Sequence, residues 1–185
     1  MRTVQVGPGD YGRVANPEQA LKYAMHRMER ERYELVEGVI TPVRSSWARE
    51  RVIDVLREQV GPRMRELGLR AGSGSLDLPG SANFYLPGMA LVPDELAKTE
   101  EVLLPSQTAL VVEVTELSEV YTECRRRYAQ YGAPLHLLVD RLERSCTLSS
   151  GPSGLGYTRT VGPHPFGVPV RLPEPFELDL DTSEF

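Results

Sequence analysis

Glu113 is the residue whose setting in the sequence points most clearly to chemistry. It lies inside the apolar run 110–114, which is rich in valine and typical of a buried strand rather than a loop. A carboxylate buried in a strand needs a partner, which can be a metal ion, a cationic side chain or a network of hydrogen bonds. The function of the chain therefore depends on what else the sequence places around Glu113.

The stretch 108–140 contains the elements that position this carboxylate. Its pattern predicts a buried strand ending at Glu113, a helix, and a second buried strand ending at Asp140. Many α/β folds return the chain to the sheet through such a helix and present catalytic groups where a strand stops. We therefore expect a strand–helix–strand unit at the centre of the fold.

Composition limits the class of protein. The 185 residues suffice for one domain with a full core, and the formal net charge of −5 argues against strong non-specific adhesion to nucleic acid. Cys124 and Cys146 have no metal-ligand spacing and are expected to be free thiols. The chain start lacks the apolar core of a signal peptide, and no run is long enough for a membrane helix, so we expect a cytoplasmic protein.

The first part of the chain predicts an arm, a helix and a hairpin. Residues 1–15 show no periodicity and are expected to form a loose N-terminal arm, with a single domain over 16–185. Residues 16–32 have the pattern of a helix that begins at an Asn-Pro pair. The string YELVEGVITP over 33–42 predicts a β-hairpin that turns at its Glu-Gly pair.

A long helix follows the hairpin. It is expected to begin at a cap on Ser45 or Ser46 and to end at Gly68. The Gly61-Pro62 pair inside it predicts a kink or a split into two helices, because proline removes a helical hydrogen bond.

Strands dominate the rest of the sequence. Residues 69–93 predict strands separated by glycine-rich turns, and 94–107 reads as a polar connection. After Asp140 we expect a hairpin with a flexible loop at 149–156. The proline-rich tail 164–185 predicts an extended, exposed segment that lies at an edge or wraps around the domain.

Four strings, in this order, resemble one known family. YELVEGVI is similar to its hairpin, LVVEVTELS to its central strand, and YAQYGAPLHLLVD to its following helix and strand. HPFGVPVRLPEP resembles the ending of its actinobacterial members. The chain thus resembles the Uma-two family of the PD-(D/E)xK restriction-endonuclease-like superfamily over about residues 20–183. The resemblance implies an α/β (α+β) fold, with a mixed β-sheet flanked by helices, an N-terminal helix and hairpin, and a C-terminal β extension.

The family's chemistry is metal-dependent hydrolysis of a phosphodiester. A divalent cation lowers the pKa of the attacking water and neutralises charge on the phosphoryl oxygens. Mg²⁺ prefers oxygen ligands, so acidic side chains of neighbouring strands must converge on it. A lysine beside them stabilises the developing charge.

Carried over residue by residue, this site is half empty. The hairpin acid falls on Glu37, with Glu34 as the alternative, and the central-strand acid falls on Glu113, which would be the metal ligand that remains. The family's other acidic ligand, however, falls on Gly88, and its lysine on Cys124. The resemblance therefore implies a remnant catalytic site made of Glu113 and Glu37, with no cofactor, or Mg²⁺ only if other residues restore activity.

Substitutes for the missing groups are few. Asp94 lies past the end of its strand, and Asp77 would have to approach from a neighbouring strand. Arg125 stays protonated and cannot act as a base. His136 lies inside an apolar strand and is expected to be a core histidine whose nitrogens are satisfied. We expect no nuclease activity from this set.

Glu113 and Cys124 then have plainer roles. In a site without metal, Glu113 is expected to pair with Arg125 or to accept hydrogen bonds from Tyr33 or the backbone. Cys124 is expected to be a small buried apolar residue rather than a reactive thiol.

Three functions remain open from the sequence. The first is a catalytically inactive restriction-endonuclease-like protein that binds DNA or a protein partner, such as an active paralogue. The second is a Mg²⁺-dependent DNA endonuclease with relocated ligands, and the third is an interaction protein with no role on nucleic acid. By analogy with the superfamily, a homodimer is expected, with no membrane association.

Overall fold

The computed structural model describes residues 17–26, 32–43, 46–115 and 118–185. The predicted loose arm at 1–15 lies outside the described residues, as does the end of the first predicted helix. Within the described ranges, no helix is both long and apolar enough to cross a membrane.

The chain folds into four α-helices, one short 3₁₀ helix and thirteen strands within the described residues. The helices are α1 (Pro17–His26), α2 (Trp47–Glu66), α3 (Asp94–Thr99), η2 (Pro105–Gln107) and α4 (Ser118–Gln130). The strands are β1 (Tyr33–Val36), β2 (Val39–Pro42), β3 (Leu69–Gly72), β4 (Ser75–Leu78), β5 (Asn83–Tyr85), β6 (Met89–Pro93), β7 (Val102–Leu103), β8 (Leu110–Thr115), β9 (Leu135–Asp140), β10 (Ser145–Ser153), β11 (Gly156–Pro165), β12 (Val170–Leu172) and β13 (Leu178–Leu180).

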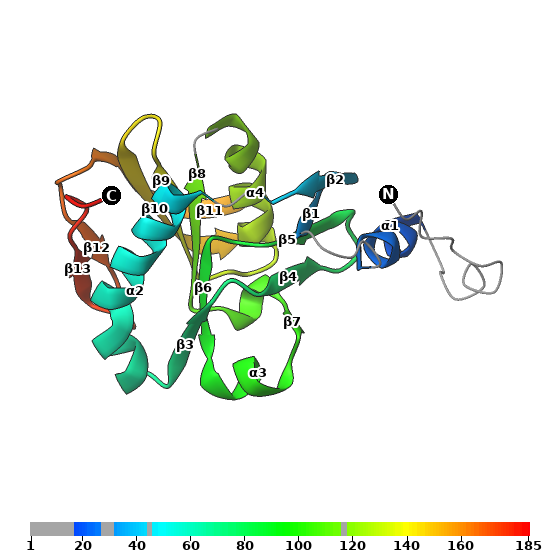
Figure 1. Ribbon diagram of the computed structural model, residues 1–185, viewed down its shortest axis with the longest axis horizontal. Coiled ribbons are helices and arrows are strands. Elements are labelled where there is room, and N and C mark those ends of the chain that lie inside the picture. The colour runs from blue at the N-terminus through cyan, green and yellow to red at the C-terminus, as the bar shows by residue number, and fades with distance from the viewer. Residues whose placement is uncertain (1–16, 27–31, 44–45, 116–117) are drawn as a thin grey trace.

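Two sheets carry the architecture (Figure 1). The larger one has the order β11-β10-β9-β8-β6-β3, and the smaller one has the order β2-β1-β5-β4-β7. Most neighbours are antiparallel, but β8 and β9 pair in parallel because α4 returns the chain between them. This mixed arrangement with flanking helices confirms the predicted fold class and the predicted strand–helix–strand unit.

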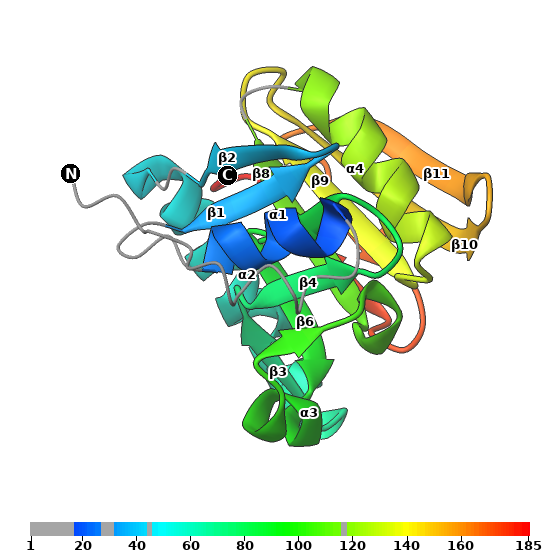
Figure 2. The ribbon, with the colours of Figure 1, turned by 90° about the vertical axis from the view of Figure 1, so that its right-hand side faces the viewer.

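The core consists of three clusters of buried side chains, each covered by a different helix. Figure 2 shows α1 and α4 beside different sheets. Helix α2 and the β12–β13 hairpin bury one face of the larger sheet. Helix α4 covers its other face and joins it to the smaller sheet, in a cluster that includes Tyr85, Val111 and Tyr128. Helix α1 packs on the smaller sheet through Met25, which lies in one cluster with Leu35.

The C-terminal tail forms the β extension that the resemblance implies, but it is buried rather than exposed. Instead of an exposed extended segment, it forms the β12–β13 hairpin and buries Val170, Leu172, Phe176 and Leu180 in the main core. The prediction of an exposed tail is wrong because the many prolines conceal an alternation of apolar residues, which face α2 and the sheet. The tail is therefore part of the domain core.

Three local predictions also need correction. Helix α2 is a single helix through Pro62, with its N-cap at Ser46. Pro62 has no N–H to donate to the backbone carbonyl of Glu58. The helix stays unbroken because both residues are exposed, so water can reach that carbonyl. The predicted hairpin after Asp140 is confirmed as β10 and β11, but the predicted loop 149–156 shrinks to a turn at Gly154 and Leu155. The polar connection contains α3, β7 and η2.

Candidate functional site

The candidate site surrounds a crossover between the two sheets. The chain leaves the smaller sheet after Tyr85 and enters the larger sheet at Met89, and the three linking residues are buried. Pro87 has no N–H, so the crossover holds two backbone donors, at Leu86 and Gly88. The N–H of Leu86 donates to Glu34 Oε1 at 2.9 Å, and the N–H of Gly88 donates to Glu113 Oε2 at 3.4 Å. Two glutamates therefore satisfy the buried backbone where strand pairing stops.

Side chains of β1 alternate between the two faces of the sheet, and this alternation decides whether Glu34 or Glu37 reaches the crossover. Leu35 pairs with Phe84 and faces the cluster under α1, so Glu34 points to the opposite side, toward the crossover. Glu37 lies in the turn with a φ of 47° and is held by Asn83 and Arg127. Glu37 was the preferred candidate from the sequence, but the structure brings Glu34 to the side of Glu113, which was the alternative.

Glu113 lies well inside β8, two residues before its end, on the face that α4 covers. Its Oε1 accepts a hydrogen bond of 2.7 Å from the Tyr128 hydroxyl, and its side chain is almost fully buried. Burial and the neighbouring Glu34 raise the pKa of Glu113, although Tyr128, Arg49 and the Gly88 N–H oppose this. Of the predicted partners of Glu113, the backbone is confirmed through the Gly88 N–H, and the second hydrogen bond comes from Tyr128, which was not predicted.

The same burial acts on Glu34. Removal from water raises its pKa, while the Leu86 N–H and the guanidinium groups of Arg49 and Arg32 act in the opposite direction. Glu34 and Glu113 therefore share one environment, in which each negative charge disfavours the other and the positive charge of Arg49 favours the charged form of both.

Gly88 is the residue that the resemblance places at the family's acidic position, and the structure shows what surrounds it. A Cβ placed on Gly88 would lie 3.2 Å from the Val112 carbonyl oxygen, 3.3 Å from Arg49 Nη2 and 3.5 Å from Ile53 Cδ1. A guanidinium group thus occupies the space where an acidic side chain at this position would begin.

Arg49 is a site residue that sequence reasoning missed. It lies three and four residues before Val52 and Ile53, which begin the buried stripe of α2. Helical periodicity therefore places Arg49 on the buried face of α2. This spacing is the sequence feature from which Arg49 could have been predicted as a site residue. The guanidinium of Arg49 lies beside Gly88 of the crossover, where its positive charge lowers the pKa of Glu34 and of Glu113 against the effect of burial.

Cys124 lies on α4 beside Tyr85, whose hydroxyl donates to Asn83 Oδ1 at 2.9 Å. The thiol is buried and free, and burial raises its pKa to about 12. It is therefore neutral and provides neither the positive charge of a lysine nor a reactive thiolate. This agrees with the plainer role expected from the sequence.

The two alternative acids are engaged elsewhere. Asp77 lies 2.6 Å from Lys22 Nζ, and its strand register with Phe84 turns it away from the crossover. Asp94 accepts from Arg70 at 2.6 Å and pairs with Lys98 at 2.8 Å. Neither replaces the missing ligand. In the described part of the chain, no group of three or more His, Cys, Asp or Glu side chains could hold a metal ion.

His136 is buried between two aromatic rings under α4. Its ring centroid lies 5.4 Å from that of Tyr128 and 6.1 Å from that of Tyr157. Neither ring nitrogen has a hydrogen-bond partner among the described residues, nor does the hydroxyl of Ser149, its register partner. The prediction of a core position is confirmed, but the prediction of satisfied nitrogens is wrong.

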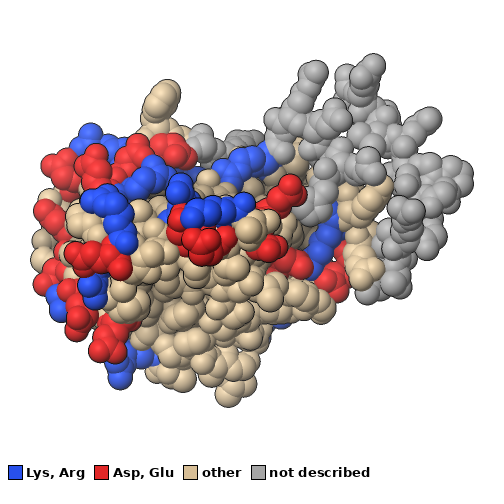
Figure 3. All heavy atoms as spheres, turned by 90° about the horizontal axis from the view of Figure 1, so that it is seen from below, with Lys and Arg blue, Asp and Glu red and all other residues tan. Residues whose placement is uncertain are grey.

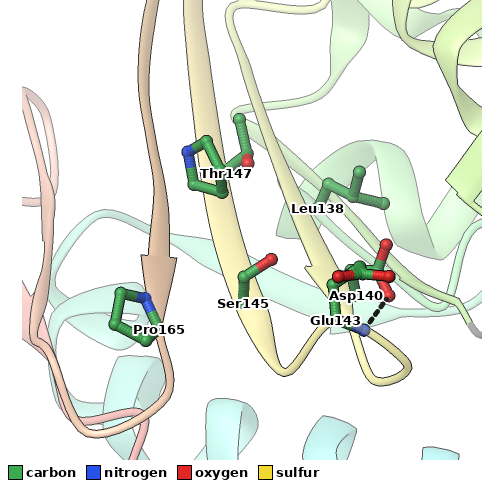
Figure 4. A pocket seen from close by; sticks show the side chains of 7 residues that line it. Leu138, Asp140, Glu143, Ser145, Thr147 and Pro165 are labelled. Carbon is green, nitrogen blue, oxygen red and sulfur yellow. Dashed lines mark hydrogen bonds between the residues drawn. The ribbon is translucent and has the colours of Figure 1, made fainter.

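An open hollow of about 400 Å³ lies on the same face of the larger sheet, over β9, β10 and β11 (Figure 4). Its polar lining includes Asp140, Glu143, Ser145 and Thr147. Asp140 Oδ1 accepts a hydrogen bond from the Glu143 backbone N–H at 2.9 Å. The hollow contains no basic side chain, so it offers no second place for the missing lysine.

Taken together, the residues present do not fit a catalytic magnesium ion. Such an ion needs several converging oxygen ligands, but Gly88 offers none and one oxygen of Glu113 is held by Tyr128. The guanidinium of Arg49 also brings a positive charge to Gly88, with Nη2 3.3 Å from where a side chain at that position would begin. What the cluster can do is hold two acids and one permanent cation in a buried, fixed arrangement.

Comparisons with known proteins agree with the fold. A family model described as "Uma2: Putative restriction endonuclease" matches residues 17–183. The chain is also similar to a solved structure described as "Crystal structure of a putative nuclease belonging to DUF820 from Anabaena variabilis ATCC 29413". That similarity has a TM-score of 0.65 and 16% identity, and it covers 89% of this chain and 95% of that one. No curated protein matches.

Proposed function

This chain belongs to the Uma2 family of restriction-endonuclease-like proteins, and from that premise we propose that it does not cleave DNA and acts by binding another protein. The observation that carries the proposal is the crossover at Gly88. The position of the family's acidic ligand has no side chain, and Arg49 Nη2 lies 3.3 Å from where its Cβ would be.

Loss of this ligand removes the basis of metal-assisted hydrolysis. Without a correctly coordinated cation, no water is activated and no charge is neutralised on the phosphoryl oxygens. The neutral thiol of Cys124 cannot take the part of the lysine, which supplies positive charge in the transition state. The two groups that the mechanism needs beyond Glu113 are therefore both absent.

Surface charge favours a protein partner over DNA. Duplex DNA is held mainly by unpaired basic side chains that contact phosphates. Among the described residues, seven basic side chains at the surface are engaged in ion pairs with acids: Arg51–Glu184, Arg57–Asp54, Arg63–Glu66, Arg70–Asp94, Lys98–Glu95, Arg126–Glu123 and Arg171–Asp179. Figure 3 shows basic and acidic atoms interspersed on one face, beside a wide area that carries neither.

A cleavage assay tests the first half of the proposal. Purified protein is incubated with supercoiled and linear DNA in the presence of Mg²⁺ or Mn²⁺, and we expect both DNAs to stay intact. The matched control is Glu113→Ala, which removes the one ligand that the family site retains. Cleavage by the natural protein that disappears in this variant would show an active endonuclease and refute the proposal.

Binding measurements test the second half. We expect no DNA binding at low salt, whereas a DNA-binding protein would show an affinity that falls steeply as salt rises. The predicted homodimer is checked by light scattering of the same preparation. A salt-dependent affinity for DNA without cleavage would replace the protein partner with DNA as the ligand.

A further inference from the structure

We propose that Arg49 takes the electrostatic place of the metal ion, so that its fixed positive charge stabilises the fold by compensating Glu34 and Glu113. This inference rests on the proposed function, since it concerns a site without catalytic metal. It assigns a role to a residue that the family resemblance does not single out in this chain.

The geometry brings three groups to one crossover. Glu34 and Glu113 bind the N–H groups of Leu86 and Gly88, which are two residues apart. The guanidinium of Arg49 approaches the same segment from α2, with Nη2 3.3 Å from the position of a Cβ on Gly88. Its side chain is only 14% exposed, and its ion pair is with Glu50 at the rim, where Nη1 and Oε1 are 3.6 Å apart. The arginine is thus held inward rather than extended into water.

Chemistry explains why a cation is needed here. A carboxylate buried without a counter-charge is strongly unfavourable, and two of them in one place repel each other. A divalent metal would serve both carboxylates in an active nuclease. Arginine stays protonated at every relevant pH and is less strongly hydrated than lysine, so it suits a partly buried position. The missing side chain at Gly88 leaves the room that the guanidinium uses.

A double-mutant cycle separates this role from simple packing. Arg49→Met keeps an apolar stem of similar length and removes the charge. It is measured in the natural chain and in a Glu34→Gln/Glu113→Gln background, where the carboxylates that need compensation are gone. Arg51→Met is the matched control, because Arg51 lies on the same helix but is exposed and paired with Glu184.

Thermal unfolding at constant salt and neutral pH gives the readout. We expect Arg49→Met to lower the melting temperature by roughly 5 °C in the natural chain and by less than half as much in the background without the two acids. Arg51→Met should change it by no more than about 1 °C. An equal decrease in both backgrounds, or no decrease in the natural chain, would overturn the proposal.

Two further outcomes keep the test decisive. If Arg49→Met alone does not fold, recovery of folding in the triple variant supports the proposal, and failure to recover overturns it. The result is also independent of the cleavage assay: DNA cleavage by the natural protein would refute the proposed function, whereas absence of coupling in the cycle would refute only the role of Arg49.

Discussion

Replacement of His136 by leucine should stabilise the protein, and more so in acid. The imidazole is fully buried, and neither nitrogen has a hydrogen-bond partner among the described residues. A buried polar group without a partner costs about 1–3 kcal/mol, and leucine of similar volume removes that cost. We therefore expect His136→Leu to be more stable than the natural protein at pH 7 by about 1 kcal/mol or more.

The pH dependence gives the sharper part of this prediction. Burial, assisted by the positive charge of Arg125, lowers the pKa of His136 from 6.5 to about 3. Between these values the unfolded chain binds a proton that the folded chain does not, so the free energy of unfolding falls as the pH falls. The slope approaches 1.36 kcal/mol per pH unit, which amounts to about 2 kcal/mol between pH 7 and pH 5. The neutral imidazole of His136 therefore leaves the free energy of unfolding undiminished above pH 6.5, and the loss accumulates as the pH falls from 6.5 toward 3.

Urea denaturation at a series of pH values measures the effect. Other groups titrate in the same range, so the informative quantity is the difference between His136→Leu and the natural protein, with His164→Gln as a control for a histidine in β11. The difference should widen by about 2 kcal/mol from pH 7 to pH 5. A constant difference, or a variant that is less stable at pH 7, would refute the reasoning.

Two other predictions concern the candidate site. Cys124 and Cys146 are both buried, and burial raises the pKa of both thiols to about 12, so a thiol reagent at pH 8 should modify neither in the native protein and both in denaturant. Rapid modification of the native protein at Cys124, identified by peptide mass, would contradict the neutral, inaccessible thiol. Restoring the family residues with Gly88→Asp and Cys124→Lys should create a Mn²⁺ site, detectable by calorimetry, only when Arg49→Ala is added, because the new aspartate would otherwise pair with the guanidinium. Equal Mn²⁺ binding by the Gly88→Asp/Cys124→Lys variant with Arg49 intact would contradict the predicted pairing of the new aspartate with Arg49.

Much of the fold could be predicted from local patterns. The hairpin at 33–42, the cap at Ser46 and the unit around Glu113 depend on periodicity, turn residues and capping, which act over a few positions. Predictions failed where distant contacts decide. The segment 149–156 is polar and rich in glycine, yet all of it except the turn at Gly154 and Leu155 forms strand, because β9 provides a partner for β10 and β10 in turn pairs with β11. The tail likewise becomes core only because α2 and the sheet cover it.

For the candidate site, as for the fold, local sequence patterns supported some predictions, whereas others depended on distant contacts. The prediction that positions 88 and 124 are gaps comes from counting along the sequence, since each lies at a fixed distance from a recognisable string. The choice between Glu34 and Glu37 could not be made in this way, because it depends on which face of β1 meets α4 rather than on the hairpin sequence. Arg49 was detectable only by asking which side of α2 faces the core.

The crossover explains how the fold can do without a metal. Its two buried N–H groups have no strand partner, and Glu34 and Glu113 each bind one of them. This task requires carboxylates but no cation of a particular kind, so it is separate from hydrolysis. In the proposed function, Gly88 and Cys124 stand in the catalytic positions, the glutamates still need a compensating charge, and Arg49 is the cation beside them. The proposed loss of catalysis is therefore compatible with retention of the acids, because the acids connect the two sheets.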